Sequence, residues 1–402
     1  MNEFDFIRRL RDQTQSRKHS ARLVTGVGDD ASVISQLAGR AVVVTTDLLA
    51  EGIDFYRDAT PPRLLGHKAL AVSLSDIAAM GARPLWSLVS IGLPSEIWDQ
   101  NFKDEFFEGY LTLADEYGVA LAGGDVSRTV EQIVIDSILL GEVSSGAAVL
   151  RSTAQPGDQI YVTGTLGGSA AGLKLIEMGA RIRRQEAGGR LQEDAEGRGV
   201  SPTVREGSIA RGSSPTVREG SESEPPAVAG GPGRSDEAAI QTLLLRHLRP
   251  SPRVGWGIVL GEERLAGAMI DISDGLSSDL AHLCRESNVG ALIQSAEIPI
   301  NKDVIKLCGR RALDPLALAL HGGEDFELLF TVHPDNAARL PKRVDGVAIS
   351  CIGEITNEPG QIRIAEKNRV WDLEPQGFEH FKNDECASTK KATHPLTRED
   401  GS

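Results

Sequence analysis

The chain has 402 residues, of which 40% are hydrophobic and 25% charged, so it is long enough for two globular domains and far from disordered or fibrous compositions. Acids number 57 against 43 lysines and arginines, and the net charge of -14 argues against a general nucleic-acid or membrane-surface binder. An anionic ligand would need help from cations.

Helix and strand patterns alternate through the first 150 residues. Apolar residues at helical spacing predict a short helix around residues 4–10. A β-branched run over 41–49 predicts a buried strand that carries an acidic side chain, Asp47, near its end. A helix over 61–82 begins at prolines and ends near a glycine. An amphipathic helix over 102–118 and strands over 119–124 and 132–143 follow. This order predicts a mixed α/β domain over residues 1–150.

A second domain is predicted over residues 151–381. Residues 155–179 read as a turn, a strand, a glycine-rich loop and a helix. Between about 184 and 235 the composition becomes rich in Gly, Ser, Glu, Arg and Pro, and SPTVREGS occurs at 201–208 and again at 214–221. Such a composition is typical of a linker-like insert. Residues 382–402 form a polar tail.

Acidic residues recur where apolar segments end. Asp29 and Asp30 follow a glycine turn in GVGDDASV, and Asp47 ends the strand predicted over 41–49. The other acids of this kind are Asp76, Asp125, Asp271, Asp274 and Asp279. Any one of them is commonly a turn former or helix cap, but in one cleft they would repel by roughly 4 kcal/mol per pair at 4 Å. Mg²⁺ would relieve this repulsion, because it binds carboxylates, water and substrate phosphates. The acids therefore predict magnesium-dependent nucleotide chemistry.

Other sequence motifs for phosphate binding or for catalysis are absent or give only a weak signal. The Walker A pattern and the EF-hand spacing do not occur. The loop GTLGGSAAG, residues 164–172, fits either an anion-binding helix N-terminus or close strand-to-helix packing. Glu324 and Asp325 are turn acids or hold a cationic substrate group. No Ser-His or Cys-His pattern appears, but an acceptor that is already an ionised phosphate needs no general base.

Cysteine usage and the hydropathy pattern indicate a cytoplasmic protein. The four cysteines, at positions 284, 308, 351 and 386, form no C-x-x-C pair, so neither a zinc knuckle nor a disulfide framework is expected. The first ten residues lack the apolar stretch of a signal peptide, and no run of about 18 apolar residues predicts a membrane span.

Eight motifs in order resemble one enzyme family. The motifs are, in chain order, GVGDDASV, TTDLLAEGIDF, KALAVSLSDIAAMGA, AGGDVSR, LRSTAQPGD, DISDGLSSDL, HGGEDFELLFTV and GFEHF. The likeness runs from residue 3 to about 381 and is interrupted only by the insert. Together they closely resemble the thiamine-monophosphate kinases of the aminoimidazole-ribonucleotide-synthetase-like superfamily. The resemblance implies a two-domain α/β fold whose N-terminal domains pair into a homodimer. It also implies magnesium-assisted transfer of the ATP γ-phosphoryl group to thiamine monophosphate.

The resemblance also implies roles for individual residues. The implied metal ligands are Asp30, Thr45, Thr46, Asp47, Asp76, Asp125, Asp271 and Asp274. The implied ATP contacts are Phe107, Gly124, Asp125, Arg151 and Ser273, and the implied thiamine contacts are Asp54, Glu324 and Phe378. An arginine can meet phosphate oxygens bidentately, and an aromatic ring can stack on a cationic heterocycle.

Three positions depart from the family pattern, and two rival functions of the same superfamily make different demands on the sequence. The family often has Asn, His and Tyr where Ser73, Asp54 and Phe107 stand. A selenophosphate synthetase would need a reactive cysteine in the N-terminal segment, whereas the first cysteine is Cys284. An ATP-binding maturation or scaffold protein of the same superfamily stays open as the alternative.

The insert is predicted to be a tolerated surface loop, because long loops add only a modest entropic cost. We expect a protein that lacks residues 188–233 to phosphorylate thiamine monophosphate at the rate of the full chain in a steady-state assay. A deletion protein with native circular dichroism but no turnover would contradict this prediction.

Overall fold

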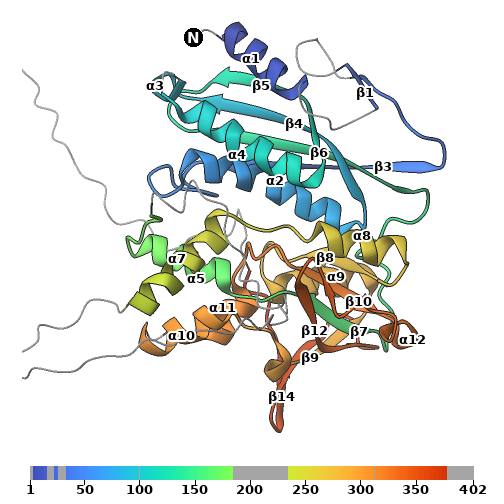
Figure 1. Cartoon of the computed structure of the whole chain (residues 1–402). Coiled ribbons are helices and arrows are strands. Elements are labelled where there is room, and N and C mark those ends of the chain that lie inside the picture. The colour runs from blue at the N-terminus through green and yellow to red at the C-terminus, as the bar shows by residue number, and fades with distance from the viewer. Residues whose placement is uncertain are drawn as a thin grey trace, which may run out of the picture.

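The computed structural model describes residues 3–15, 22–25, 33–98, 100–183, 234–311 and 313–377. The chain forms two stacked halves, each built on its own β-sheet (Figure 1). The first half contains α1 (Glu3–Gln15), β1 (Leu23–Thr25), β2 (Val33–Ile34), β3 (Arg40–Ala50), α2 (Pro62–Ala79), β4 (Arg83–Leu93), α3 (Ser95–Trp98), α4 (Phe102–Tyr117), β5 (Ala120–Arg128) and β6 (Val134–Ser144). The helices and strands predicted for this half are confirmed.

The second half alternates strands and helices in the same way, as the predicted α/β class requires. It begins with β7 (Gln159–Thr163), α5 (Gly168–Glu177), α7 (Arg234–Leu248), α8 (Val254–Glu262), β8 (Met269–Asp271), α9 (Leu276–Ser287), β9 (Gly290–Gln294) and the 3₁₀ helix η1 (Ser295–Glu297). It continues with α10 (Lys302–Arg311), α11 (Pro315–His321), β10 (Leu328–Val332), α12 (Pro334–Ala337), β11 (Arg343–Val344), β12 (Val347–Thr356), β13 (Ile362–Glu366) and β14 (Arg369–Asp372).

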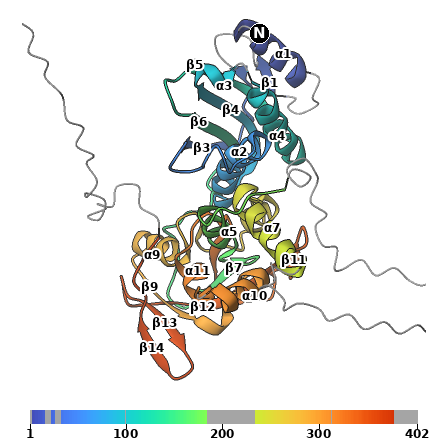
Figure 2. The same ribbon diagram turned by 90° about the vertical axis from the view of Figure 1, so that its left-hand side faces the viewer.

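The N-terminal sheet has the order β3-β6-β4-β5, and α2 and α4 lie on one side of it (Figure 2). Helix α2 is buried almost all round, because it packs on the sheet, on α4 and on α8. Glycines allow α2 and α4 to approach closely. A Cβ atom at Gly66 would lie 1.9 Å from the carbonyl oxygen of Phe106, and one at Gly109 would lie 1.8 Å from that of Arg63. This close packing holds α2 in a fixed place between the two halves.

The other side of the N-terminal sheet is open and partly apolar. Residues alternate along β3 between the two faces, as a strand with one covered face requires. Val42, Val44 and Leu48 point to the open face, with exposed fractions of 38%, 61% and 63%. Ile138 of β6 lies opposite Thr46 of β3 in the same sheet.

The C-terminal sheet has the order β14-β13-β9-β12-β7-β10-β8, with β11 paired to β12. Buried aliphatic residues of β7, β8, β9 and β10 form its core with α9. Beside it, α5, α7 and α10 share a separate apolar cluster. Helix α7 therefore packs on α5 although residues 184–233 lie between them in the chain.

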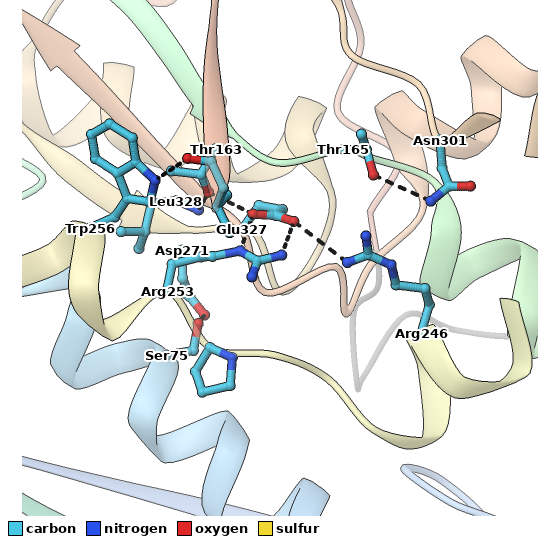
Figure 3. A network of polar contacts seen from close by, with 12 residues as sticks. Ser75, Thr163, Thr165, Arg246, Arg253, Trp256, Asp271, Asn301, Glu327 and Leu328 are labelled. Atoms are coloured by element: carbon cyan, nitrogen blue, oxygen red, sulfur yellow. Dashed lines mark hydrogen bonds and ion pairs between the residues drawn. The ribbon is translucent and has the colours of Figure 1, made fainter. Parts of the chain in front are cut away.

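A buried ion pair fixes the start of α8 to the C-terminal sheet (Figure 3). Arg253 donates from Nε and Nη2 to the two carboxylate oxygens of Glu327, each at 2.5 Å. Glu327 is fully buried and also accepts the Thr163 hydroxyl at 2.7 Å. On α2, Ser75 donates to Asp271 Oδ2 of β8 at 2.8 Å. Polar contacts therefore connect α2 to the C-terminal half at the edge of the same sheet.

Candidate active site

A cavity of about 700 Å³ lies between the two halves. Its walls come from the end of β3, the 53–56 turn, α5, α11 and the loops at 273–274, 322–326 and 376–377. Five of the residues singled out from the sequence line it, namely Asp47, Asp54, Ser273, Asp274 and Glu324. The cavity has both carboxylates and apolar side chains in its wall, as a site for an organic ion requires.

Three aspartates from different elements interact beside this cavity. Asp47 comes from β3, Asp76 from α2 and Asp271 from β8. Each has a hydroxyl partner: Ser73 donates to Asp47 at 2.7 Å, Ser75 to Asp271 at 2.8 Å, and Thr45 to Asp76. These contacts join a strand and a helix of the first half to a strand of the second.

Burial and mutual repulsion make these carboxylates costly to ionise. Burial is the main cause that raises the pKa of all three, and the charge of Asp76 raises the pKa of Asp47 and Asp271 further. The charge of Arg151 lowers the pKa of Asp76 and Asp271. A cation that displaced the protons would therefore be stabilised here.

The donor set fits a magnesium ion that also binds substrate phosphates. Within the described ranges, no group of three or more His, Cys, Asp or Glu side chains is arranged to hold a metal ion by itself. Mg²⁺ in nucleotide enzymes is usually held by one or two carboxylates, with water and phosphate oxygens completing the shell. Carboxylates and hydroxyls from Asp47, Asp76, Asp271 and Thr45 match that chemistry.

Thr46 and Asp125 belong to the other face of the N-terminal sheet. Asp125 of β5, Ser90 of β4 and Asp136 of β6 lie in one row across the sheet. The Thr46 hydroxyl donates to Asp136 at 2.6 Å. Neighbouring residues of a strand point to opposite faces, so Thr46 and Asp47 diverge. Of the predicted metal ligands in the described part of the N-terminal sheet, Thr45 and Asp47 thus lie on one face and Thr46 and Asp125 on the other.

The predicted ATP contacts are spread over several elements. Phe107 is 4% exposed and packs on Phe6 with ring centroids 5.5 Å apart. Gly124 has φ +150°, and a Cβ atom there would lie 2.0 Å from the carbonyl oxygen of Val89, so the approach of β4 requires glycine. Ser273 lies in the wall of the cavity. Asp30 and Phe378 lie outside the described residues, although Gly377 borders the cavity.

A buried lysine meets Glu324 at the cavity wall. Lys68 of α2 is 1% exposed, and its Nζ lies 2.7 Å from Glu324 Oε1 and donates to the carbonyl oxygen of Asp54 at 3.1 Å. His247 Nδ1 lies 3.1 Å from the other oxygen, Oε2. Burial alone would raise the pKa of Glu324, but Lys68 and His247 hold it at about 2. Glu324 is therefore an anion at neutral pH.

The start of α5 is occupied by a carboxylate of the chain itself. Asp325 accepts hydrogen bonds from the backbone N–H groups of Gly167 at 2.6 Å and Ser169 at 3.1 Å. These two amides of the 164–172 loop therefore already have a carboxyl partner within the chain, and Gly172 allows α7 to approach α5 closely, since a Cβ atom there would lie 2.1 Å from the carbonyl oxygen of Leu243. Asp325 thus has a structural role, whereas Glu324, one residue earlier, faces the cavity.

Comparisons with known proteins match both halves of the chain. Residues 28–143 match the model for the AIR synthase related protein, N-terminal domain, and residues 253–365 match the model for its C-terminal domain. Thiamine-monophosphate kinase of Escherichia coli K12 is 34% identical over 386 residues, which cover 94% of this chain and 98% of that protein. The chain belongs to the thiamine-monophosphate kinase family.

Solved structures of the thiamine-monophosphate kinase family have the same fold. The crystal structure of the enzyme from Stenotrophomonas maltophilia K279a is 32% identical, has a TM-score of 0.69, and is matched over 92% of this chain and 98% of that one. AaThiL complexed with AMPPCP and TMP is 29% identical, with a TM-score of 0.65 and coverage of 94% and 97%. Among the described residues, no helix is long and apolar enough to span a bilayer.

Two side chains that contact Glu324, Lys68 and His247, were not singled out from the sequence. Lys68 is the lone charge in the first part of the apolar motif KALAVSLSD, which is a sequence signal for a paired, buried lysine. His247 gives no such signal, because a single histidine in an amphipathic helix is usually structural. Only the packing of α7 beside the 322–327 loop brings it to Glu324.

The ionised state of Glu324 predicts a measurable pH dependence of stability. Its folded pKa of about 2 is below its ordinary value of 4.5, so its stabilising contribution is complete above pH 4.5 and is lost as the pH falls toward 2. We expect the free energy of unfolding, measured in urea, to fall less steeply over this range in Glu324→Gln than in the wild type. Glu262→Gln, which alters an exposed pair with Arg83, should keep the wild-type slope, and equal slopes for all three proteins would contradict the prediction.

Proposed function

We propose that the protein transfers the γ-phosphoryl group of ATP to thiamine monophosphate and releases thiamine diphosphate and ADP. The observation that carries this proposal is a single cavity in which two different groups of acidic side chains lie at separate places. Carboxylates of both halves meet beside Asp47, and the anionic Glu324 lies in the wall. The first place suits metal-bound phosphates, and the second suits an organic cation. The name of the Escherichia coli relative and the two ligands of AaThiL, an ATP analogue and TMP, support the same reaction.

The carboxylates are proposed to hold Mg²⁺ together with the phosphates of both reactants. Asp47, Asp76 and Asp271 would bind the ions on the helix side of β3, with Asp274 in the cavity wall. The remaining proposed ligands are Asp30, Thr45, Thr46 and Asp125. When bound, the ions would neutralise the phosphate oxygens and so lower the cost of bringing two polyanions together.

The chain's own side chains have mainly to position the reactants. An oxygen of the acceptor phosphate forms a bond to Pγ, and the bond between Pγ and the β–γ bridging oxygen breaks, with both electrons leaving on ADP. The acceptor oxygen needs no general base, because a phosphomonoester has its second pKa near 6. Arg151, whose charge already acts on Asp76 and Asp271, is proposed to bind ATP phosphate oxygens. Phe107, Gly124, Asp125 and Ser273 complete the proposed ATP site.

The thiamine part of the acceptor is proposed to lie against Glu324, Asp54 and Phe378. Thiamine carries a permanent positive charge on its thiazolium ring, so an ionised carboxylate in a largely apolar wall is a suitable partner. Asp54 lines the same cavity and also accepts the backbone N–H of Ala50 at 2.7 Å. We also propose, as the sequence predicts, that the two domains divide near residue 150 and that the protein is cytoplasmic.

The direct test is to incubate the purified protein with Mg²⁺, ATP and thiamine monophosphate and to separate the products by chromatography. We expect thiamine diphosphate and ADP in equal amounts, and no thiamine diphosphate when Mg²⁺ is chelated. ATP hydrolysis with unchanged thiamine monophosphate would refute the kinase and favour the maturation or scaffold protein.

The carboxylates beside the cavity should be needed for turnover but not for folding. We expect Asp47→Asn and Asp76→Asn each to lower kcat on the order of 100-fold, because each removes a charge that would hold the metal ions. Thermal unfolding should show folded proteins, since the repulsion among the three acids is reduced. Asp335→Asn, in an exposed residue at the surface of the C-terminal half, is the matched control, and near-normal kcat in the Asp47 or Asp76 variant would remove that residue from the site.

We also propose that the open face of the N-terminal sheet is the surface that pairs two copies of the chain. Val42, Val44 and Leu48 expose apolar area on this face, whereas α2 and α4 lie on the other side of the sheet (Figure 2). Exposed apolar surface of this kind is typical of subunit interfaces. Thr46 and Asp125 lie on the same face, so the proposed interface borders part of the predicted metal-ligand set.

The dimer proposal predicts that a charge on this face separates the subunits. We expect Val44→Lys to elute as a monomer in size-exclusion chromatography with light scattering, under conditions in which the wild type is a dimer. Val370→Lys changes a similarly exposed valine, 56% against 61% for Val44, in β14 of the other half and should stay dimeric. A dimeric Val44→Lys protein would exclude this face.

A further inference from the structure

The pair formed by Lys68 and Glu324 is difficult to explain as a device for stability alone. The Lys68 ammonium group is almost fully buried, and it comes from the N-terminal half, whereas Glu324 belongs to the C-terminal half. Removing two charges from water costs about as much as their attraction returns, so a buried ion pair is rarely a net gain over apolar residues. A pair retained at the wall of a binding cavity points to a role in that cavity.

Both oxygens of Glu324 are held in place. Oε1 lies 2.7 Å from Lys68 Nζ, and Oε2 lies 3.1 Å from His247 Nδ1. His247 Nδ1 is also 3.1 Å from the hydroxyl of Ser169 on α5. Glu324 nevertheless keeps 28% of its side chain exposed, whereas Lys68 keeps 1% and His247 6%. The cavity therefore meets the carboxylate, with the lysine behind it.

The backbone around Glu324 is held in an unfavourable conformation. Glu324 and Phe326 both have positive φ, +60° and +49°, which costs about 1 kcal/mol or more for such residues and is concentrated at functional sites. Backbone hydrogen bonds from Glu324 N–H to Ser273 oxygen at 2.7 Å and from Phe326 N–H to Ile272 oxygen at 2.9 Å hold the loop in this form. The loop thus presents Glu324 to the cavity and turns Asp325 inward to α5.

Helix α2 connects this carboxylate to the other end of the site. Lys68 precedes Asp76 by eight positions in the helix, which is about 12 Å along its axis. Lys68 contacts Glu324, while Ser75 and Asp76 interact with Asp271. One rigid, buried helix therefore sets the spacing between the proposed metal end and the carboxylate in the wall.

We propose that Lys68 is a positioning residue for the acceptor: with His247, it holds the Glu324 carboxylate oriented so that this carboxylate contacts the cationic part of thiamine monophosphate. The proposal rests on the proposed function and adds two residues to it. Lys68 does not line the cavity and acts through Glu324, whereas His247 lines the cavity beside Glu324. Their removal should therefore weaken binding of the acceptor and leave binding of ATP unchanged.

The test compares Lys68→Met, Glu324→Gln and the double variant in steady-state assays. We expect Lys68→Met to raise KM for thiamine monophosphate on the order of tenfold, with KM for ATP unchanged within about twofold. Lys103→Met is the matched control, because Lys103 is also a buried lysine of the N-terminal half, at 6% exposure, but donates to the carbonyl oxygens of Trp98 and Gln100. It should leave both KM values unchanged.

The double variant separates positioning from folding, since it leaves no unpaired buried charge. If Lys68 acts through Glu324, the double variant and Glu324→Gln should have the same acceptor KM, even if Lys68→Met alone does not fold. An unchanged acceptor KM in folded Lys68→Met, an equal rise in both KM values, or a further loss in the double variant would overturn the role of Lys68. A wild-type protein that does not phosphorylate thiamine monophosphate would instead refute the proposed function and, with it, the acceptor.

Discussion

The burial of like charges at the contact between the two halves is the constraint on which the site depends. Burial raises the pKa of Asp47, Asp76 and Asp271, and the charge of Asp76 raises the pKa of the other two further. A cation that binds between these carboxylates would relieve their repulsion, which favours cation binding. Bound cations would in turn attract polyanions, which a chain with a net charge of -14 otherwise repels. The acidity of the chain and its proposed phosphate chemistry are thus compatible.

Helix α2 positions several of these side chains, because it is buried between the two halves and does not lie on the surface. Its contacts with the sheet, α4 and α8 leave it little freedom to move. From this position it supplies Ser73 and Asp76 to the carboxylate group and Lys68 to Glu324. An apolar helix with a few buried polar groups can place each of them accurately, since side chains around it are packed at high density.

Much of the fold and part of the site could be predicted from local patterns. The β-branched run around Val43 and the proline-started helix at Pro62 are strong signals, because strand and helix periods differ. The acids at the ends of apolar segments were also visible. The partner of each acid was not, because Ser75 and Asp271 are 196 positions apart and no local pattern encodes such a contact. The two interpretations of the 164–172 loop likewise depended on whether Asp325 reached it.

The sequence by itself determined the α/β class, the order of the elements, the acidic character of the site and, through eight ordered motifs, the resemblance to one enzyme family. Only the tertiary structure decided that Thr46 and Asp47 face opposite sides of one strand, that Asp325 caps α5, and that Lys68 and His247 surround Glu324. The physical reason is that local periodicity specifies which face of an element is buried, whereas side-chain contacts between distant elements arise only when those elements pack together.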